Sequence, residues 1–221
     1  MPPFSAFLFD LDGTLIDQFA AIERAHAHTL RQLGLPEPTT AQVRAAVGGG
    51  LDNAIARLAG PGRIAEARAI YQPYWDATML DDVKLNPGAR ELLEQLHARG
   101  AKLAVFTNKH GPSSRRICER LGLAPLLDGN FGATDTPWLK PQPEFAAHAL
   151  RALGAEPART CLVGDSTYDL AAARNAGLAF YGVTTGTHSA DALRAAGAEH
   201  LYPDLTALAG ALLPPTASPQ P

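Results

Sequence analysis

The sequence predicts an α/β protein in which a doubly wound parallel sheet is interrupted, after its first strand, by an inserted helical segment. Two patterns indicate this fold. From residue 86 onward, short apolar runs alternate with amphipathic helical stretches, which is typical of a parallel sheet covered by helices on both faces. Residues 16–86 have helical spacing instead. The chain has 221 residues, of which 46% are hydrophobic, so it is long enough for one core with an insertion.

The elements before residue 86 begin with a strand at AFLF (6–9), a fully apolar run. Helical spacing then predicts three stretches, at 18–35, 40–60 and 63–80. The middle stretch divides into two short helices, because three consecutive glycines, Gly48 to Gly50, interrupt it. Pro73 predicts a kink or a break in the last stretch.

Beyond residue 86 the alternation continues to the C-terminus. The predicted strands are 101–107, 129–134, 160–165, 178–184 and an edge strand at 199–203. The predicted helices are 86–100, 111–122, 143–154, 168–177, 189–197 and 204–213. The Pro-rich residues 214–221 are expected to form a disordered tail.

Composition and charge argue against several classes of protein. The formal net charge is −3, whereas a general nucleic-acid binder usually carries a basic patch, so no nucleic-acid partner is expected. No run approaches the roughly 18 apolar residues of a membrane span, and Asp10 breaks the N-terminal apolar run too early for a signal peptide. We therefore expect a cytoplasmic protein without a membrane partner. Cys118 and Cys161 lack a CxxC pattern and are expected to be small core residues.

The residues able to do chemistry fall at the ends of strands that are distant in the sequence. They are Asp10 and Asp12 after AFLF, Thr107 and Asn108 after LAVF, and Asp165 and Asp169 after TCLVG. In an open α/β sheet, ligands bind outside the carboxyl ends of the strands, so these side chains should converge at one edge. The sequence therefore predicts a single site, with Lys140 nearby.

Several carboxylates in one pocket cannot all stay ionised without a cation, and an oxygen-only ligand set suits Mg²⁺. An ammonium from Lys140 and the uncharged donors of Thr107 and Asn108 suit a phosphoryl group, which indicates phosphoryl transfer. Asp10 can attack phosphorus as a nucleophile. Asp12, on the same side of the strand, can protonate the leaving alcohol and then activate water, because the repulsion between the two carboxylates raises the pKa of one of them.

Four motifs in this order resemble those of the haloacid dehalogenase (HAD) superfamily, and the resemblance covers nearly the whole chain. They are DLDGT (10–14), TN (107–108), KP (140–141) and GDSTYD (164–169). The inserted segment resembles the helical cap of subfamily I. FTNK (106–109), GDSTYDLAAARNAG (164–177) and GVTTG (182–186) are similar to the corresponding stretches of phosphoglycolate phosphatases, although Gln18 stands where Ser or Thr is usual and KPQPE replaces KPDP or KPAP.

The resemblance implies a Rossmann-like core at 1–15 and 87–213 and a helical cap at 16–86. It implies that Asp10 is the nucleophile and Asp12 the general acid and base, and that Thr107 and Lys140 hold the phosphoryl group. It further implies that Mg²⁺ is bound by Asp10, the main-chain carbonyl of Asp12 and Asp165, with Asp169 in the inner or the outer coordination shell. The expected activity is hydrolysis of a small phosphomonoester, with 2-phosphoglycolate as the first candidate, by a monomer or a homodimer. Since the family's dehalogenases lack an acid at the place of Asp12, the chain looks like a phosphatase.

Three alternatives stay open. A β-phosphoglucomutase-like enzyme would return the phosphoryl group to a sugar, and its cap would carry a His or Lys; here residues 16–83 contain His26 and His28 but no lysine. A phosphonate hydrolase would need a cap lysine and no acid at position 12. A receiver-like or other non-catalytic phosphate-binding module would show at most one phosphorylation event, so multiple turnover separates it from an enzyme.

Several residues near the motifs allow two interpretations. Lys109 and His110 either reach the substrate or lie exposed in a loop, and Asp169 is also placed to favour the start of its helix. Arg44 and Arg57 would suit a substrate carboxylate, although a solvated helix face is favoured. Trp75, Trp138 and the two histidines of the first helical stretch are expected to pack rather than to bind, and Asp81 and Asp82 are expected near a hinge.

Overall fold

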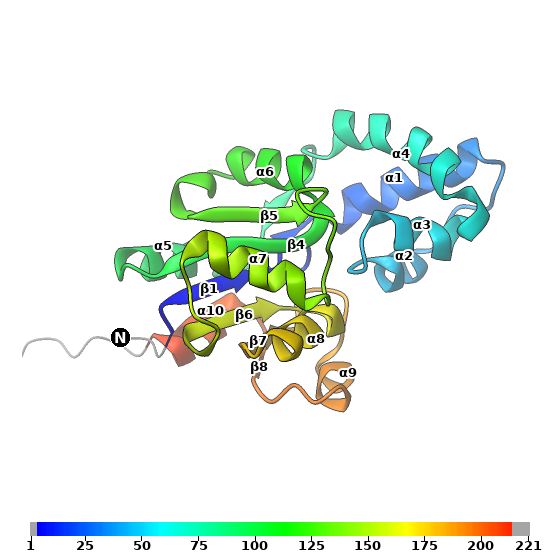
Figure 1. The fold of residues 1–221 in the computed structure, drawn as a ribbon. Helices are drawn as coiled ribbons and strands as arrows, with labels where there is room; N and C mark the ends of the chain where they lie inside the picture. The colour runs from blue at the N-terminus through cyan, green and yellow to red at the C-terminus, as the bar shows by residue number, and fades with distance from the viewer. Residues whose placement is uncertain (1–3, 214–221) are drawn as a thin grey trace, which may run out of the picture.

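The computed structural model describes residues 4–213, and a parallel six-stranded sheet forms its centre (Figure 1). The strand order is β5-β4-β1-β6-β7-β8, and every neighbouring pair is parallel. The strands are β1 (Ala6–Phe9), β4 (Lys102–His110), β5 (Gly129–Ala133), β6 (Thr160–Gly164), β7 (Ala179–Val183) and β8 (Leu201–Tyr202). The predicted sheet is confirmed, while the tail predicted at 214–221 lies outside the described residues.

Helices cover both faces of the sheet, because alternate side chains of the buried strands point to opposite faces. On β1, Phe7 and Phe9 pack in one apolar cluster, whereas Leu8 packs in another. The first cluster includes residues of α5 (Ala89–Ala98), α6 (Gly111–Arg120) and α10 (Leu205–Leu212), and the second those of α7 (Pro143–Leu153) and α8 (Thr167–Ala176). A short helix, α9 (Ala190–Ala195), follows β7. Cys118 and Cys161 are buried and free, as predicted.

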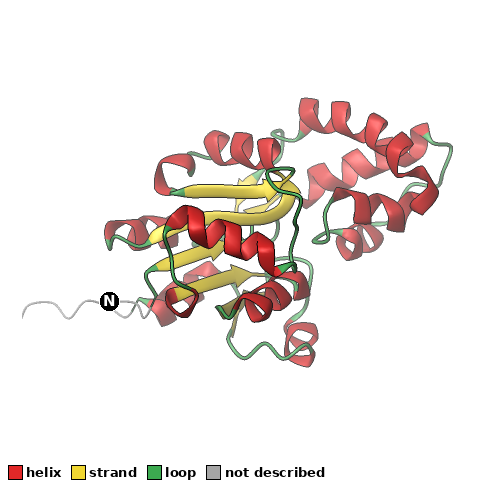
Figure 2. Ribbon diagram, viewed as in Figure 1, coloured by secondary structure: helices red, strands yellow, loops and turns green. Residues whose placement is uncertain are grey.

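Four helices between β1 and α5 gather beyond the carboxyl ends of the strands (Figures 1 and 2). They are α1 (Phe19–Gln32), α2 (Thr40–Ala46), α3 (Leu51–Ala59) and α4 (Ile64–Thr78). The glycines divide α2 from α3 as predicted, with positive φ at Gly48 (108°) and Gly50 (87°). A break at Pro73 was one predicted outcome, but α4 continues through this residue. No helix within residues 4–213 is long and apolar enough to cross a membrane.

Two features of the backbone differ from the prediction. The chain enters and leaves the helical segment through a pair of antiparallel strands, β2 (Ile16–Asp17) and β3 (Lys84–Leu85), which are too short to produce a periodic pattern. In addition, β4 extends to His110 rather than ending at residue 107, with a shift of register between Phe106 and His110. Such irregularities are frequent next to active sites, because they redirect side chains.

Candidate active site

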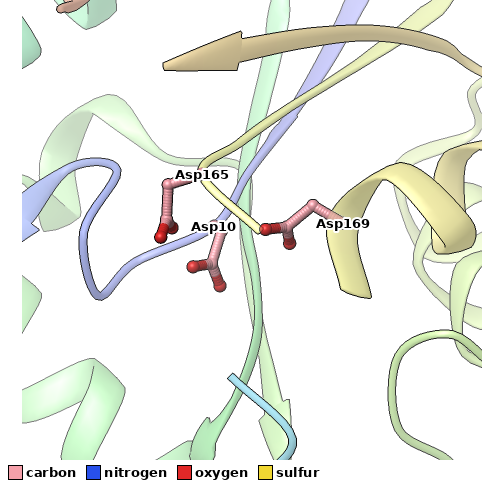
Figure 3. Close-up of side chains that lie close together, drawn as sticks. All are labelled: Asp10, Asp165 and Asp169. Atoms are coloured by element: carbon pink, nitrogen blue, oxygen red, sulfur yellow. The ribbon is translucent and has the colours of Figure 1, made fainter. Parts of the chain in front are cut away.

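Three aspartates meet at the carboxyl edge of the sheet (Figure 3). Asp10 directly follows β1, Asp165 directly follows β6, and Asp169 lies in the first turn of α8. One carboxylate oxygen of each lies within 4.8 Å of the others. The residues are only 7%, 1% and 0% exposed, so their charges are removed from water. The predicted convergence of these three residues is therefore present.

Lys140 supplies a positive charge to this cluster. Its Nζ donates hydrogen bonds of 2.6 Å to Asp10 Oδ1 and of 2.6 Å to Asp169 Oδ1. The Lys140 side chain is only 2% exposed. Both contacts are therefore shielded from solvent. Hydrogen bonds between charged groups are stronger in such a buried environment than in water.

Burial dominates the electrostatics of the cluster. It raises the pKa of Asp10 to about 6, although Lys140 acts in the opposite direction. Burial, together with the charges of Asp10 and Asp169, raises the pKa of Asp165 to about 8. Burial also opposes the charge on Lys140, but the two carboxylates outweigh it and hold its pKa above the ordinary value. The negative charge of the three carboxylates thus exceeds what one ammonium compensates.

This arrangement fits a divalent metal ion. The three carboxylates offer only oxygen ligands, the set that Mg²⁺ and similar hard cations prefer. The raised pKa values of Asp10 and Asp165 indicate that a further cation would stabilise their ionised forms. The carboxylate of Asp12 is not part of the cluster, so the metal contact predicted for its main-chain carbonyl stays a prediction.

Asp165 is held by donors that the sequence reasoning did not identify. Thr14 Oγ1 donates to Asp165 Oδ1 at 3.1 Å, and the Thr187 main-chain N–H and Oγ1 donate to Oδ2 at 2.7 and 2.9 Å. Close packing around this carboxylate requires two glycines. A Cβ at Gly186 would overlap Asp165 Oδ2, and one at Gly13 (φ 87°) would lie 2.7 Å from the Gly186 Cα. Gly13 lies in the motif DLDGT and Gly186 in the stretch GVTTG, but the contact between the two glycines depends on the fold.

Asp169 starts its helix as the sequence allowed, while its role as a metal ligand stays a prediction. Its Oδ2 accepts hydrogen bonds from the Ser166 N–H (3.0 Å) and Oγ (2.6 Å), which completes a capping box at the start of α8. Its Oδ1 accepts the hydrogen bond from Lys140. The helix cap therefore fixes the carboxylate that orients the lysine.

Asp12 is paired with Lys109. The sequence allowed two interpretations of this lysine, a contact with the substrate or an exposed position in a loop. Lys109 Nζ donates to Asp12 Oδ1 at 3.1 Å and to Oδ2 at 2.9 Å, and the two side chains are 8% and 13% exposed. The same ammonium lies 4.4 Å from the centre of the Trp75 ring, a cation–π contact. Because β4 continues past residue 107, Lys109 points into the site rather than into solvent.

The residues of the second motif line the site in different ways. Thr107 is 2% exposed, and its Oγ1 accepts a hydrogen bond of 3.2 Å from the Lys109 N–H. The amide of Asn108 donates to the Gly48 and Lys140 carbonyls at 2.9 and 3.0 Å, and its Oδ1 accepts from the Lys140 N–H at 2.7 Å. Both amide donors are thus occupied, so Asn108 orients Lys140 here; its predicted contact with substrate stays a prediction.

A pocket joins this site to the inserted helices. Its lining residues come from both parts of the molecule, with Asp10, Asp12, Thr107, Asn108 and Lys109 on one side and His26, Leu51, Tyr71 and Trp75 on the other. Besides the Asn108–Gly48 hydrogen bond, Asn53 Nδ2 contacts Tyr168 Oη at 3.4 Å across the same boundary. The helices α1, α3 and α4, with the connection that precedes α3, therefore form one wall of the cavity that contains Asp10.

Comparison with known proteins identifies the family in which this arrangement of residues occurs. Residues 7–183 match the family model described as haloacid dehalogenase-like hydrolase. Among curated proteins, "Probable phosphatase IndB" of Dickeya dadantii is 36% identical, and the match covers 96% of each chain. A phosphoglycolate phosphatase of Vibrio vulnificus is 30% identical over 93% of this chain and 94% of its own.

Solved structures agree with this assignment. A predicted phosphoglycolate phosphatase from Haemophilus somnus superimposes with a TM-score of 0.88 at 26% identity, over 94% of this chain and 97% of its own. CbbY from Rhodobacter sphaeroides, determined in complex with phosphate, has a TM-score of 0.77 at 26% identity, over 93% and 96%. The fold, the clustered aspartates and the match along most of the sequence lead to one conclusion: the chain belongs to the haloacid dehalogenase-like hydrolases.

Proposed function

We propose that the protein is a metal-dependent phosphatase that hydrolyses small phosphomonoesters with Asp10 as its nucleophile. The observation that carries this proposal is the environment of Asp10, which lies in a pocket beside two further buried carboxylates and 2.6 Å from the ammonium of Lys140. A dianionic phosphoryl group is stabilised by such positive charge. Relatives named as phosphatases support the same reaction class.

Asp10, Asp165 and Asp169 would hold the metal ion, and the resemblance adds the main-chain carbonyl of Asp12. We propose Mg²⁺ as the ion, because it is usually bound by one or two carboxylates together with a substrate phosphate. When bound, the ion would neutralise charge on the phosphoryl oxygens. Thr14 and Thr187 would keep Asp165 in its orientation, since they donate to both of its oxygens.

The chemistry of the chain's own residues follows in two steps. A carboxylate oxygen of Asp10 forms a bond to phosphorus while the bond from phosphorus to the alcohol oxygen breaks, and Asp12 gives its proton to that oxygen. Asp12 then takes a proton from a water molecule that attacks the aspartyl-phosphate, which releases inorganic phosphate and restores Asp10. Lys140 is the fixed positive charge beside the nucleophile in both steps.

Residues 16–86 are proposed as a cap, and residues 1–15 and 87–213 as the catalytic core. The proposal is supported by the position of α1–α4 beyond the strand ends and by the pocket residues that both parts contribute (Figure 1). A closed cap would exclude bulk water from Asp10, which protects a reactive acyl phosphate from random hydrolysis. The names of the relatives make 2-phosphoglycolate the first ester to test.

The test is release of inorganic phosphate from a panel of phosphomonoesters that includes 2-phosphoglycolate, sugar phosphates and nucleotides. We expect multiple turnovers with Mg²⁺, and loss of activity with EDTA and in Asp10→Asn. Asp191→Asn is the matched control, because Asp191 has a side chain that is 95% exposed and lies outside the pocket lining. Folded protein with Mg²⁺ that turns over none of the esters would contradict the proposed function.

A further inference from the structure

We propose that the pocket selects phosphomonoesters whose alcohol portion is uncharged, and that His26 determines this specificity by hydrogen bonding to that portion. The inference rests on the proposed phosphatase function and names its substrate class. It separates two kinds of ester that the family assignment leaves together, those with a second acidic group and those without one.

The wall of the pocket that faces Asp10 across the cavity is apolar and aromatic. The inserted helices and their connections contribute Ile22, Val47, Leu51, Ala54, Tyr71 and Trp75. The rings form a row, since Tyr71 and Trp75 stack with centroids 5.8 Å apart and His26 lies 4.9 Å from Tyr71. Burial, followed by the charge of Asp12, raises the pKa of Tyr71, so its hydroxyl stays protonated. Such a wall suits apolar or planar groups.

The cations that a substrate carboxylate would need are absent or already engaged. Among the described residues that line the pocket there is no arginine, and Lys109 is the one lysine. Its ammonium is bound to both oxygens of Asp12. Arg44 and Arg57, which the sequence suggested for a substrate carboxylate, lie elsewhere: Arg44 covers the Phe19 ring at 4.1 Å, and Arg57 donates to the Ala45 carbonyl.

An anionic group that entered this part of the pocket would therefore lose its hydration without gaining a free cation. Burial of an unpaired charge is strongly unfavourable, whereas burial of an uncharged polar group costs much less and can be compensated by one hydrogen bond. The histidines of the pocket do not change this balance near neutral pH. Burial lowers the pKa of His26 to about 4 and lowers that of His110 as well, so both imidazoles are neutral there.

His26 carries a buried polar atom of this wall that lacks a partner. The residue is 2% exposed, and its Nδ1 is buried without a hydrogen bond in the described structure. A buried polar atom without a partner is uncommon in folded proteins, because its desolvation is not compensated. Because His26 lines the pocket, a hydroxyl, carbonyl or amide on the alcohol portion of a substrate would meet this imidazole and compensate it. His26 would then favour uncharged esters that carry one such group.

The test compares three esters that share one phosphoryl group. In 2-phosphoglycolate a carboxylate replaces the hydroxymethyl group of 2-hydroxyethyl phosphate, and methyl phosphate has neither group. We expect the wild-type protein to have a kcat/KM for 2-hydroxyethyl phosphate at least about tenfold above that for 2-phosphoglycolate, about the effect of one hydrogen bond or unpaired group. A preference for 2-phosphoglycolate would overturn the inference.

The variant His26→Leu isolates the role of the imidazole. It should raise KM for 2-hydroxyethyl phosphate about tenfold more than KM for methyl phosphate, since methyl phosphate offers no hydrogen bond to His26. His28→Leu is the matched control on the same helix, because His28 stacks on Tyr74 at 4.1 Å and is not part of the lining. An equal loss on both esters in His26→Leu would mean a structural role and would overturn the assignment of His26.

Binding separates failure of this inference from failure of the proposed function. Calorimetry on Asp10→Asn with the same three esters repeats the comparison without turnover. Tighter binding of 2-hydroxyethyl phosphate than of 2-phosphoglycolate supports the inference, even if the wild-type protein hydrolyses neither, in which case only the proposed reaction is contradicted. The reverse order of affinities overturns the inference, whether or not turnover occurs.

Discussion

Replacement of Lys140 by methionine tests how the buried carboxylates are compensated. The side chain is 2% exposed and makes two contacts of 2.6 Å, to Asp10 and Asp169. Methionine keeps most of the apolar volume but removes the charge. Removal of one partner from a buried ion pair typically costs about 3–5 kcal/mol, because the remaining charge stays buried without compensation. We expect a loss of this size in the free energy of unfolding when the metal is removed with EDTA.

The loss should depend on pH in a defined direction. Burial has already raised the pKa of Asp10 from 3.8 to about 6, and Lys140 limits that rise, so in Lys140→Met the pKa of Asp10 moves further up. A carboxyl group with a raised folded-state pKa contributes its full stability below the unfolded-state pKa and loses it as pH rises through the folded-state pKa. At pH values above the new pKa, each further unit by which the folded-state pKa of Asp10 rises lowers the free energy of unfolding by about 1.4 kcal/mol.

Urea unfolding at about pH 5 and about pH 8 measures both effects, and the difference between wild type and Lys140→Met should be larger at the higher pH. Lys102→Met is the matched control. Lys102 lies 2.7 Å from Asp128, but the two side chains are 55% and 29% exposed, so the expected loss is below about 1 kcal/mol. The reasoning is refuted if Lys140→Met costs no more than Lys102→Met, or if its cost is the same at both pH values.

Three further substitutions test packing and charge, two of them at the site and one in α10. Gly186→Ala forces its new methyl group against Asp165, so steady-state kinetics should show kcat/KM reduced at least about tenfold, and unchanged kinetics would contradict the packing. Gly210→Ala has no atom within 4 Å of its new methyl group and lies inside α10, so the free energy of unfolding in urea should rise by about 0.5–1 kcal/mol. Lys109→Met leaves Asp12 without its ion pair, so unfolding should be easier by about 1–3 kcal/mol, and a loss no larger than for Lys102→Met would show that the pair is solvated.

The three clustered aspartates were predictable because they depend on topology alone. Once Asp10 and Asp165 are placed directly after parallel strands, the geometry of the sheet brings them together, and β1 and β6 are indeed neighbours. Asp169 follows four residues after Asp165, within the first turn of the next helix. Alternation of apolar side chains likewise fixes which strand residues face which layer of helices.

The supporting contacts were not predictable, because they depend on distances between loops. Thr14 and Thr187 both donate to Asp165, yet they are separated by most of the chain, and no spacing rule connects them. The position of Lys109 depended on where β4 ends, since a strand that stopped at residue 107 would have left this lysine in a loop. Boundaries of elements are the part of a sequence-based prediction that local patterns define least.

His26 illustrates a different limit. On a helical pattern it is a histidine with apolar neighbours, which is normally a packed core residue. The structure shows that it is packed against Tyr71 and also that its Nδ1 has no partner in the described residues. A missing hydrogen-bond partner can be recognised only when the positions of all neighbouring atoms are known, so no sequence pattern predicts it.

The paired strands β2 and β3 have a consequence for how this protein tolerates change. Ile16 and Leu85 lie opposite each other, so the helical segment begins and ends at adjacent points beside the sheet. The entropy needed to close a segment between two such fixed points grows only slowly with its length, by about 0.6 kcal/mol for each doubling. Helices between these strands can therefore be lengthened, shortened or exchanged while the sheet keeps its register. The residues proposed to hold the phosphoryl group and those proposed to select its alcohol are thus free to diverge at different rates.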